Sequence, residues 1–406
     1  MKFDVPPNFD IKSVDFRKAY GNIFTTLYRH FGGDYVSEIE DAIQNAFYKA
    51  LKTWQNGNVP NQWDSWLYVV ARNDLINQLK ALQRKAEGLN EMFRNDQISF
   101  EEKDDNRLNV LVLFVSIPNI SQKSKVVFLL KVIFGLSIKE ISECTLLSEA
   151  AVSKMITRLK QGLKDNPIEA GEIETPSESD LLIIEEVLYA IFNIGFDSFN
   201  EKHPNTFNED LCLEAVALIK LFIKKYNRLT SKHLFALFCL HLSRISAKIS
   251  GDKLVPFFLQ NSQDWQIPFL QLGLQNLIKP DALNQYYIEA LIVSKHMMNS
   301  NFDEAYWEEI ILLYEMLSKI TASPIVELNK CYCLHKAGRS IEALTILNKL
   351  ENDLPPNHFY FSLVKADVIK NQSTSLDAHN LMEQAIIQAD QSIRKNLLKS
   401  LVEEAK

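Results

Sequence analysis

Apolar residues recur at spacings of three and four along most of this 406-residue chain. This spacing places them on one face of an α-helix. Only 12 glycines and 13 prolines interrupt the pattern, and Leu, Ile, Lys, Glu and Ala, which suit helices, fill much of the rest. The length allows roughly two to four domains, each with its own core. The sequence therefore predicts an all-α protein built from several helical domains.

The overall charge and the cysteines exclude several classes of protein. A net charge of −7 argues against a protein that coats nucleic acid along its whole length, although local basic surfaces remain compatible with it. The first residues lack an apolar signal segment, and the longest apolar runs are too short to cross a bilayer. We therefore expect a cytoplasmic protein with no membrane partner. The odd, scattered set of five cysteines argues against a secreted disulfide framework: Cys144, Cys212, Cys239, Cys331 and Cys333.

Two segments lose helical periodicity and gather charge, which divides the chain into domains. The first is a linker at residues 86–106, between helical units at 1–85 and 107–164. The second, residues 165–180, is rich in carboxylates and contains two prolines. Such a tract could imitate DNA in cis, but a solvated linker is the interpretation we favour. We expect a helical extension domain at 181–285 and helical repeats at 286–406.

Residues 38–84 predict two amphipathic helices joined by a short loop. In the first, the apolar face comprises Ile39, Ala42, Ile43, Ala46, Phe47, Ala50, Leu51 and Trp54. Its polar face carries Asp41, Gln44, Asn45, Lys49 and Lys52. The second helix is expected to bury Trp66, Val69, Val70, Ile76 and Leu79, and to expose Arg72 and a stripe of Asn73, Asn77, Lys80 and Arg84. Amides and cations in one row can read base edges and hold phosphates.

Residues 121–163 predict a helix-turn-helix. Ser137 and Glu140 form the pattern of a capping box at the start of a short helix. After a turn at Cys144–Leu147, Ser148 can cap a longer helix that directs Val152, Ile156, Leu159 and Leu163 inward. Its outer face offers Glu149, Ser153, Lys154, Thr157, Arg158 and Lys160. Polar groups near the start of this helix would face base edges, and the later cations would hold phosphates.

These two stretches resemble regions 2 and 4 of bacterial RNA polymerase sigma factors of the extracytoplasmic-function (ECF) type. The region 2 pattern is matched by Asp41, Gln44, Phe47, Trp66, Leu67, Ala71, Arg72 and Asn73, and the region 4 pattern by Ser148, Glu149, Val152, Arg158 and Lys160. The turn at 144–147 lacks a glycine, and Met155 stands where that family usually has arginine. Residues 187–196 and 210–217 resemble the ECF subgroup with a helical C-terminal region that contains tetratricopeptide (TPR) repeats.

The resemblance implies a region 2 helical bundle, a region 4 helix-turn-helix, and core RNA polymerase and promoter DNA as partners. Asp41, Gln44, Asn45 and Lys49 would bind the polymerase. The −10 element would be bound by Trp63, Arg72, Asn73, Asn77, Lys80 and Arg84, and the −35 element by Ser148, Glu149, Ser153, Lys154, Thr157, Arg158 and Lys160. Of the aromatic residues near the loop that would melt the promoter, Trp54 and Trp66 are expected in the core, whereas Trp63 stays undecided between core and base stacking.

Near the C-terminus, the segments Pro324–Ala337, Gly338–Ser340 and Ile341–Leu350 read as helix, tight turn and helix within a repeat of ~34 residues. They look like TPR hairpins, whose concave surface suits a peptide from a signalling protein. Cys331, Cys333 and His335 could suggest a metal site. We favour a buried helical core there, because Cys333 points away from the other two on a helix. We therefore expect no cofactor.

No catalytic motif appears: the chain lacks a glycine-rich phosphate loop and a nucleophile or zinc-protease signature. An enzyme is therefore not expected. The main prediction is a sigma factor that binds core polymerase, with a C-terminal extension that regulates it. Two alternatives stay open. One is a DNA-binding regulator with TPR-like repeats that does not act through polymerase, and the other is a protein-interaction scaffold.

Overall fold

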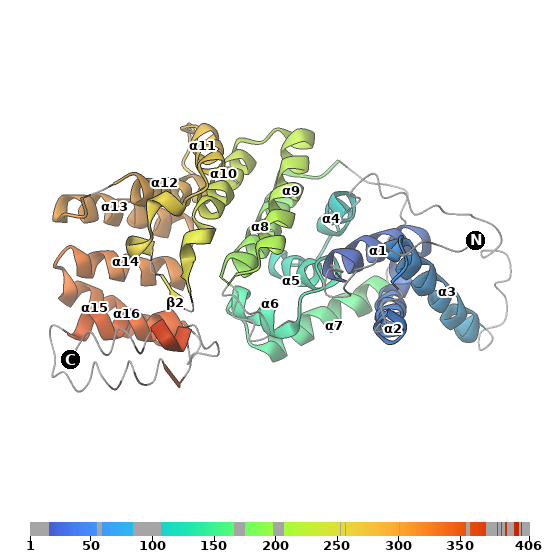
Figure 1. Ribbon diagram of the computed structural model, residues 1–406. Coiled ribbons are helices and arrows are strands. Elements are labelled where there is room, and N and C mark those ends of the chain that lie inside the picture. The colour runs from blue at the N-terminus through green and yellow to red at the C-terminus, as the bar shows by residue number, and fades with distance from the viewer. Residues whose placement is uncertain are drawn as a thin grey trace. The chain divides into compact units, whose positions relative to one another are not determined.

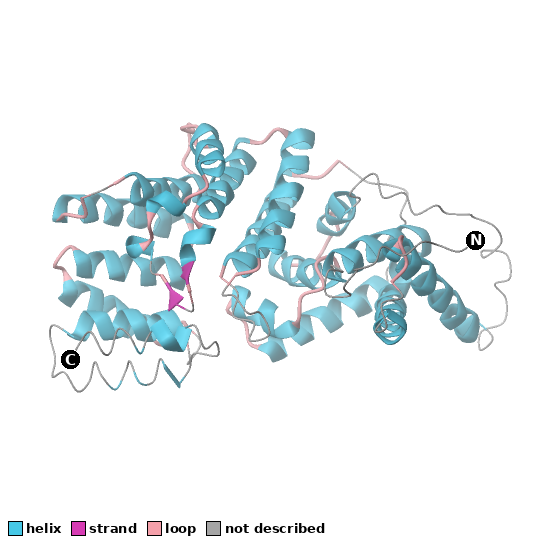
Figure 2. Ribbon diagram, viewed as in Figure 1, coloured by secondary structure: helices cyan, strands magenta, loops and turns pink. Residues whose placement is uncertain are grey.

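A computed structural model of the chain is all-α, as predicted (Figures 1 and 2). Within the described residues, the strands are limited to β1 (Ile249–Ser250) and β2 (Lys253–Leu254), which pair antiparallel. None of the described helices combines the length and the apolar character of a membrane span. The chain divides into two compact units, Met1–Val187 and Leu188–Lys406. The structure describes residues 16–54, 59–83, 107–165, 175–197, 207–251, 253–255, 257–299, 301–354, 358–370, 380, 383, 386–387, 394–397 and 399.

The first unit contains the helices that carry the predicted sites. They are α1 (Phe16–Phe31), the short 3-10 helix η2 (Gly33–Tyr35), α2 (Val36–Trp54), α3 (Trp63–Gln83), α4 (Arg107–Val115), α5 (Gln122–Val132), α6 (Ile138–Thr145), α7 (Glu149–Asp165) and the first half of α8 (Glu178–Phe196). The unit boundary thus lies inside α8.

Aromatic side chains on α1 form much of the core of this unit. The rings of Phe24 and Tyr28 stack with centroids 6.0 Å apart, and Tyr28 lies 4.7 Å from Phe114 on α4. Phe114 in turn contacts Phe128 on α5, with ring centroids 5.2 Å apart. All four rings are buried. The two predicted DNA-binding modules therefore share one continuous aromatic core.

Two predictions about buried faces are wrong. Leu51 on α2 is 46% exposed, because it lies beyond the edge of the buried face that Ile39, Ile43 and Ala50 define. Val69 on α3 is 51% exposed, because that helix turns a different set of residues inward. Trp66, Val70 and Ile76 are only half-buried. The residues buried on α3 are Leu67, Tyr68, Ala71, Leu75 and Leu79.

The end of the predicted acidic linker is helical. Residues 178–180 form the first turn of α8, where the Ser177 hydroxyl donates to Asp180 Oδ2 over 2.6 Å and its oxygen accepts from the Asp180 amide. Two contacts attach this half of α8 to α5. Gln122 Nε2 donates to Glu186 over 2.8 Å, and Lys125 Nζ lies 3.7 Å from Asp180 Oδ1.

The second unit continues with helices joined by short connections. They are the end of α8, α9 (Glu209–Tyr226), α10 (Leu229–Ser243), 3-10 helix η3 (Ile245–Lys248), β1, β2, 3-10 helices η4 (Phe257–Leu259) and η5 (Ser262–Asp264), α11 (Ile267–Asn276), α12 (Gln285–Met298), α13 (Glu304–Ile320), α14 (Pro324–Lys336), α15 (Ser340–Leu350) and α16 (Phe359–Lys370). From α12 to α16, each helix packs on the next one in sequence.

The predicted helix, turn and helix at 324–350 are confirmed as α14 and α15. The turn between them contains Gly338, whose φ of 78° lies in the left-handed region that glycine adopts most easily. Cys331 and Cys333 are buried on α14, and burial raises the pKa of each thiol to about 12. In the described part of the chain, no group of three or more His, Cys, Asp or Glu residues is placed to hold a metal ion.

Candidate nucleic-acid interface

The outer face of α2 places the four predicted polymerase-binding residues in two environments. Asp41 and Gln44 are exposed on the same side of the helix. Asn45 and Lys49 are also exposed but are drawn toward Asp74 on α3. The Asn45 amide donates to Asp74 Oδ2 over 2.8 Å, and Lys49 Nζ lies 3.6 Å from Oδ1.

Asp74 thus links α2 to α3. Burial by itself would raise the pKa of Asp74, but hydrogen bonds from Asn45 and Gln78 and the charge of Lys49 lower it overall. Asp74 therefore stays ionised and connects the two helices at their outer surface. Sequence reasoning did not single out this carboxylate, because two of its partners, Asn45 and Lys49, lie on another helix.

Two apolar side chains extend the α2 face. Tyr48 is 57% exposed, and Leu51 lies one turn further along the same side. Lys52 Nζ lies 4.6 Å from the centroid of the Tyr48 ring. Asp41, Gln44, Tyr48 and Leu51 therefore form one exposed strip with a polar start and an apolar end. The exposure of Leu51 was not foreseen.

The predicted stripe on α3 is exposed. Asn73, Asn77 and Lys80 follow one another at helical spacing and all face solvent, and Val69 extends the stripe by one turn toward the helix start. Arg72 lies beside the stripe and is half-buried. Arg84 lies outside the described residues. The stripe thus combines two amides, one cation and one apolar side chain.

The aromatic residues at the start of α3 separate into core and surface. Trp54 is buried, and its ring centroid lies 5.2 Å from that of Trp66. Tyr68 is also buried. Trp63, at the first residue of α3, is half-buried. Trp54 therefore belongs to the core, as predicted, whereas part of the Trp63 side chain is exposed.

Helices α6 and α7 form a short helix, a tight turn and a longer helix. The predicted capping box is present, since the Ser137 hydroxyl oxygen accepts from the Glu140 amide over 3.2 Å and Glu140 accepts from the Ser137 amide over 2.8 Å. Leu146 ends α6 in the left-handed conformation, with φ of 55°. A non-glycine residue adopts this conformation at a cost of roughly 1–2 kcal/mol. The turn therefore forms without the glycine that such turns usually contain.

The predicted residues of α7 also fall into two groups. Glu149, Lys154, Thr157 and Arg158 are exposed, as is Ser148, whose hydroxyl oxygen accepts from the Ala151 amide over 3.2 Å. Ser153 is half-buried, and its carbonyl accepts from the Thr157 hydroxyl over 2.9 Å. Lys160 is half-buried and forms an ion pair with Glu40 on α2. Lys154 and Arg158, four residues apart, thus provide the exposed cations of this helix face.

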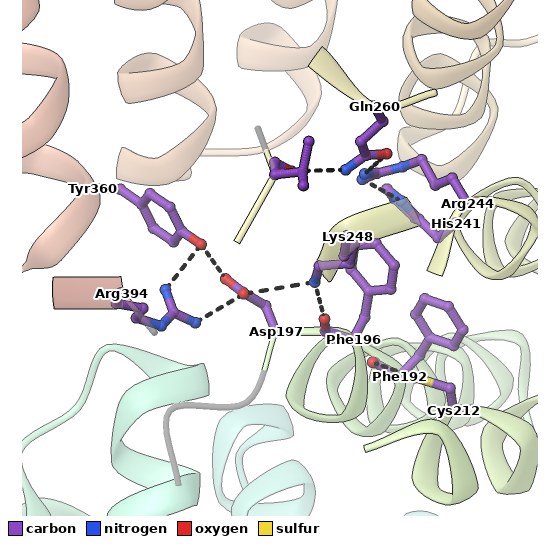
Figure 3. A network of polar contacts seen from close by, with 11 residues as sticks. Phe192, Phe196, Asp197, Cys212, His241, Arg244, Lys248, Gln260, Tyr360 and Arg394 are labelled. Carbon is purple, nitrogen blue, oxygen red and sulfur yellow. Dashed lines mark hydrogen bonds and ion pairs between the residues drawn. The ribbon is translucent and has the colours of Figure 1, made fainter. Parts of the chain in front are cut away.

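A buried charge network lies in the second unit (Figure 3). Arg394 Nη2 donates to Asp197 Oδ1 over 2.9 Å, and the Tyr360 hydroxyl donates to Oδ2 over 2.7 Å. Lys248 Nζ lies 3.8 Å from Asp197 Oδ1 and donates to the Phe196 carbonyl. Burial would raise the pKa of Asp197, but Arg394 and Lys248 hold it below its ordinary value. Asp197 therefore joins residues that are far apart in sequence.

A third buried cation, Arg244, extends this network. The Arg244 guanidinium lies 4.9 Å from the Phe196 ring centroid and 4.5 Å from that of Phe257, and it contacts His241 Nδ1 over 3.3 Å. Burial lowers the pKa of Arg244 to about 10 and that of Lys248 to about 8. Burial and the neighbouring cations also lower the pKa of His241 well below its ordinary value, so its ring is neutral.

Comparison with known proteins places two family matches on this framework. Residues 16–85 match sigma-70 region 2, which spans α1, α2 and α3. Residues 181–279 match a family of unknown function (DUF6596). This matched segment includes Asp197, Arg244 and Lys248. An uncharacterized protein of Rhizobium meliloti (strain 1021) is 28% identical over 367 residues, which cover 86% of this chain and 85% of that protein. No solved structure matches the chain significantly.

The sigma-70 region 2 match covers α2 and α3, the two helices whose exposed faces are described above. The family implies core RNA polymerase and promoter DNA as partners. The chain therefore carries a sigma-70 region 2 domain near its N-terminus, which supports a sigma-factor-like role in transcription initiation.

Proposed function

We propose that this chain is a sigma factor of the ECF type, which binds core RNA polymerase and directs it to promoters by recognising −10 and −35 elements. One observation carries the proposal. The region 2 match covers two helices whose exposed faces suit different partners, with Asp41 and Gln44 on α2 and Asn73, Asn77 and Lys80 on α3.

In this proposal α2 binds the polymerase. Its strip begins with a carboxylate and an amide and continues with Tyr48 and Leu51. A polar edge beside an exposed aromatic residue is typical of a protein–protein interface, where a few such residues provide most of the binding energy. Asn45 and Lys49 contribute by holding α2 against α3 through Asp74, as well as by direct contact.

The α3 stripe binds the separated −10 strand. Asn73 and Asn77 can form hydrogen bonds with base edges, while Lys80 and Arg72 attract phosphates. Trp63, which is half-buried, stacks on an unpaired base in this proposal, an interaction worth ~1–3 kcal/mol. Val69 can contact an apolar part of a base or sugar from the same stripe. Extrusion of a base costs a few kcal/mol, which these contacts together offset.

The α6–α7 pair acts as a helix-turn-helix that binds the −35 duplex. Ser148, Glu149 and Ser153 lie nearest the start of α7, where polar groups meet base edges, and Lys154 and Thr157 follow on the exposed face. Arg158 holds the DNA backbone, and Lys160 joins it once released from Glu40. Two modest contacts in one chain give useful affinity through effective concentration. The net charge of −7 is therefore compatible with promoter binding.

The second unit regulates this activity. From α12 to α16 each helix packs on the next one, which supports TPR-like hairpins. On this basis we assign the chain to the ECF subgroup that carries such an extension. Regulation in cis, through the segment between α7 and α8, is the role we favour. Docking of a signalling protein on the repeats is the alternative.

Transcription in vitro with purified core polymerase tests the function. The full chain should support initiation from specific promoters, whereas core polymerase alone should not. Templates selected from random sequence should show two short enriched blocks near −10 and −35. Sequence-specific DNA binding without promoter-dependent transcripts would favour the DNA-binding regulator instead. The scaffold alternative predicts no salt-dependent binding of promoter DNA.

A further inference from the structure

The buried cations around Asp197 outnumber the carboxylates that could balance them (Figure 3). Arg244, Lys248 and Arg394 are all buried. Asp197 forms ion pairs with Arg394 and Lys248, and it is also the described carboxylate whose charge acts on Arg244. Three cations and one carboxylate therefore leave this part of the second unit, within the described residues, with a net charge of +2.

Arg244 has no carboxylate in direct contact among the described residues. Its Nη1 donates to Gln260 Oε1 over 3.4 Å and its Nη2 to His241 Nδ1 over 3.3 Å, both at the long end for hydrogen bonds. Its Nε is buried and donates to no atom of the described chain. Since a guanidinium presents five N–H donors, most of the donors of this side chain are unused. A buried cation in this state is costly unless an anion accompanies it.

His241 and Lys248 add further donors beside Arg244. His241 Nδ1 accepts from Arg244, so the proton of its neutral ring lies on Nε2, which has no acceptor in the described part of the chain. Lys248 Nζ donates to the Phe196 carbonyl and lies 3.8 Å from Asp197 Oδ1. An ammonium group has three N–H donors, so these two contacts do not use all of them. The three side chains thus offer many donors and few acceptors.

Two aromatic rings flank the Arg244 guanidinium, but they do not replace an anion. The Phe196 ring serves both cations, because its centroid lies 4.9 Å from Arg244 Cζ and 3.9 Å from Lys248 Nζ. The Phe257 centroid lies 4.5 Å from Arg244 Cζ. Contact with a ring returns only part of the cost of removing a cation from water. The charge of Arg244 and Lys248 therefore remains largely uncompensated.

Solvent reaches the edge of this cluster. The Asp197 side chain is 29% exposed although its partners Arg394 and Lys248 are buried. His241 and Gln260, which hold the Arg244 guanidinium, are half-buried. A small ion can therefore approach from the solvent side of these residues. The cations that would receive it are shielded from water, where their attraction for an anion is stronger than at an exposed surface.

We propose that Arg244, Lys248 and His241 form a binding site for a dianionic phosphoryl group, either free phosphate or the phosphoryl group of a phosphate monoester. A dianion balances the net charge of +2, and its oxygens accept from the unused N–H donors. A monocarboxylate has a single charge and leaves one cation unbalanced. The site lies in the second unit and outside the region 2 match, so this proposal does not depend on the proposed function.

Calorimetric titration of the intact chain with inorganic phosphate, at neutral pH and constant ionic strength, tests the site. The wild-type chain should bind about one phosphate with a dissociation constant below about 1 mM. Arg244→Gln should weaken this binding by at least about tenfold, because it removes a charged donor group. Lys224→Gln, which removes an exposed cation from α9, is the matched control and should bind like the wild type. Titration with glycerol phosphate shows whether a monoester also fits, and acetate should bind at least about tenfold more weakly than phosphate.

Thermal unfolding of the same variants separates a ligand site from a structural role of Arg244. Phosphate at about 100 times its dissociation constant should raise the ratio of folded to unfolded wild-type chain about 100-fold, and it should leave Arg244→Gln nearly unchanged. If Arg244→Gln does not fold, Arg244→Lys serves instead, because it keeps the charge but lacks Nε and the planar fork. This variant should also bind phosphate more weakly than the wild type.

Three results would overturn the site. The first is no binding of phosphate or glycerol phosphate by the wild-type chain. The second is equal phosphate affinity of the wild type and a folded Arg244 variant, which would place the bound ion elsewhere. The third is acetate binding as tight as phosphate binding, which would exclude recognition of a dianionic phosphoryl group.

Discussion

Replacement of Asp197 by alanine should release the C-terminal part of the second unit. The carboxylate contacts Arg394, Tyr360 and Lys248, and the two cations are 1% and 6% exposed respectively. Removal of one partner from a buried ion pair costs about 3–5 kcal/mol, because the remaining charge lacks compensation. Since 1.4 kcal/mol corresponds to a factor of ten, amides of α16 should exchange with solvent about 10² to 10³·⁵ times faster.

Glu309→Ala is the matched control, because it removes a carboxylate from an exposed ion pair. Glu309 lies 2.6 Å from Lys295, and its side chain is 56% exposed. An exposed pair contributes less than about 1 kcal/mol, so exchange in its helix should change by less than about fivefold. Hydrogen exchange measured by mass spectrometry on the intact chain resolves the two regions separately. Equal effects of Asp197→Ala and Glu309→Ala would refute the reasoning.

The same carboxylate predicts a dependence on pH. The pKa of Asp197 is held below its ordinary value of about 4 by Arg394 and Lys248, against the effect of burial. A carboxylate with a lowered pKa in the folded state stabilises it fully above the ordinary value, and this contribution disappears as the pH falls through the folded value. The difference in α16 exchange between wild type and Asp197→Ala should therefore be constant at neutral pH and shrink in acid. A difference that grew in acid would contradict the assignment.

Two further predictions concern the DNA-binding helix and the extension. Arg158→Ala should weaken binding of the −35 duplex across sequences and reduce the salt slope by about one unit. Lys154→Ala should weaken binding and also change sequence preference. If both variants bind the duplex like the wild type, α7 is not the recognition helix. Deletion after Val187 keeps the contacts between α5 and α8 and should change transcription markedly, in either direction, with purified components alone. Equal activity of the truncated and full-length chains would leave only the partner-docking role for the extension.

Helix positions followed from the sequence because apolar periodicity and capping residues act locally. The capping box at Ser137 and Glu140 and the turn at Gly338 depend on neighbours within a few residues, and both appear where predicted. The exposed amides Asn73 and Asn77 likewise follow from their spacing on α3.

The buried face of α3 was predicted less well, because the helix carries apolar residues of its own on more than one side. Val69 and Leu67 are both aliphatic, yet one is exposed and the other is buried. Periodicity cannot select a face when both sides carry candidates. The side of α3 opposite Asn73, Asn77 and Lys80 would have been the better prediction of the buried face, since amides and lysine rarely lie in a core.

Contacts between modules could not be predicted from local pattern. Lys160 has the spacing of a DNA-binding cation, and its partner Glu40 lies 120 residues earlier in the chain. The same holds for Asp197 and Arg394, which are separated by 197 positions. A single sequence indicates which face of each helix is apolar or polar, but it does not indicate which other helix that face contacts.

Affinity of the full chain for core RNA polymerase tests the central claim most directly. Asp41→Ala/Gln44→Ala should weaken binding by a few kcal/mol at most, with native helicity, because it removes two exposed polar groups from the proposed interface. Glu315→Ala/Gln275→Ala, a carboxylate and an amide exposed on helices of the second unit, should bind like the wild type. Undiminished affinity of a folded Asp41→Ala/Gln44→Ala variant, or an equal loss in the control, would contradict α2 as the polymerase-binding helix.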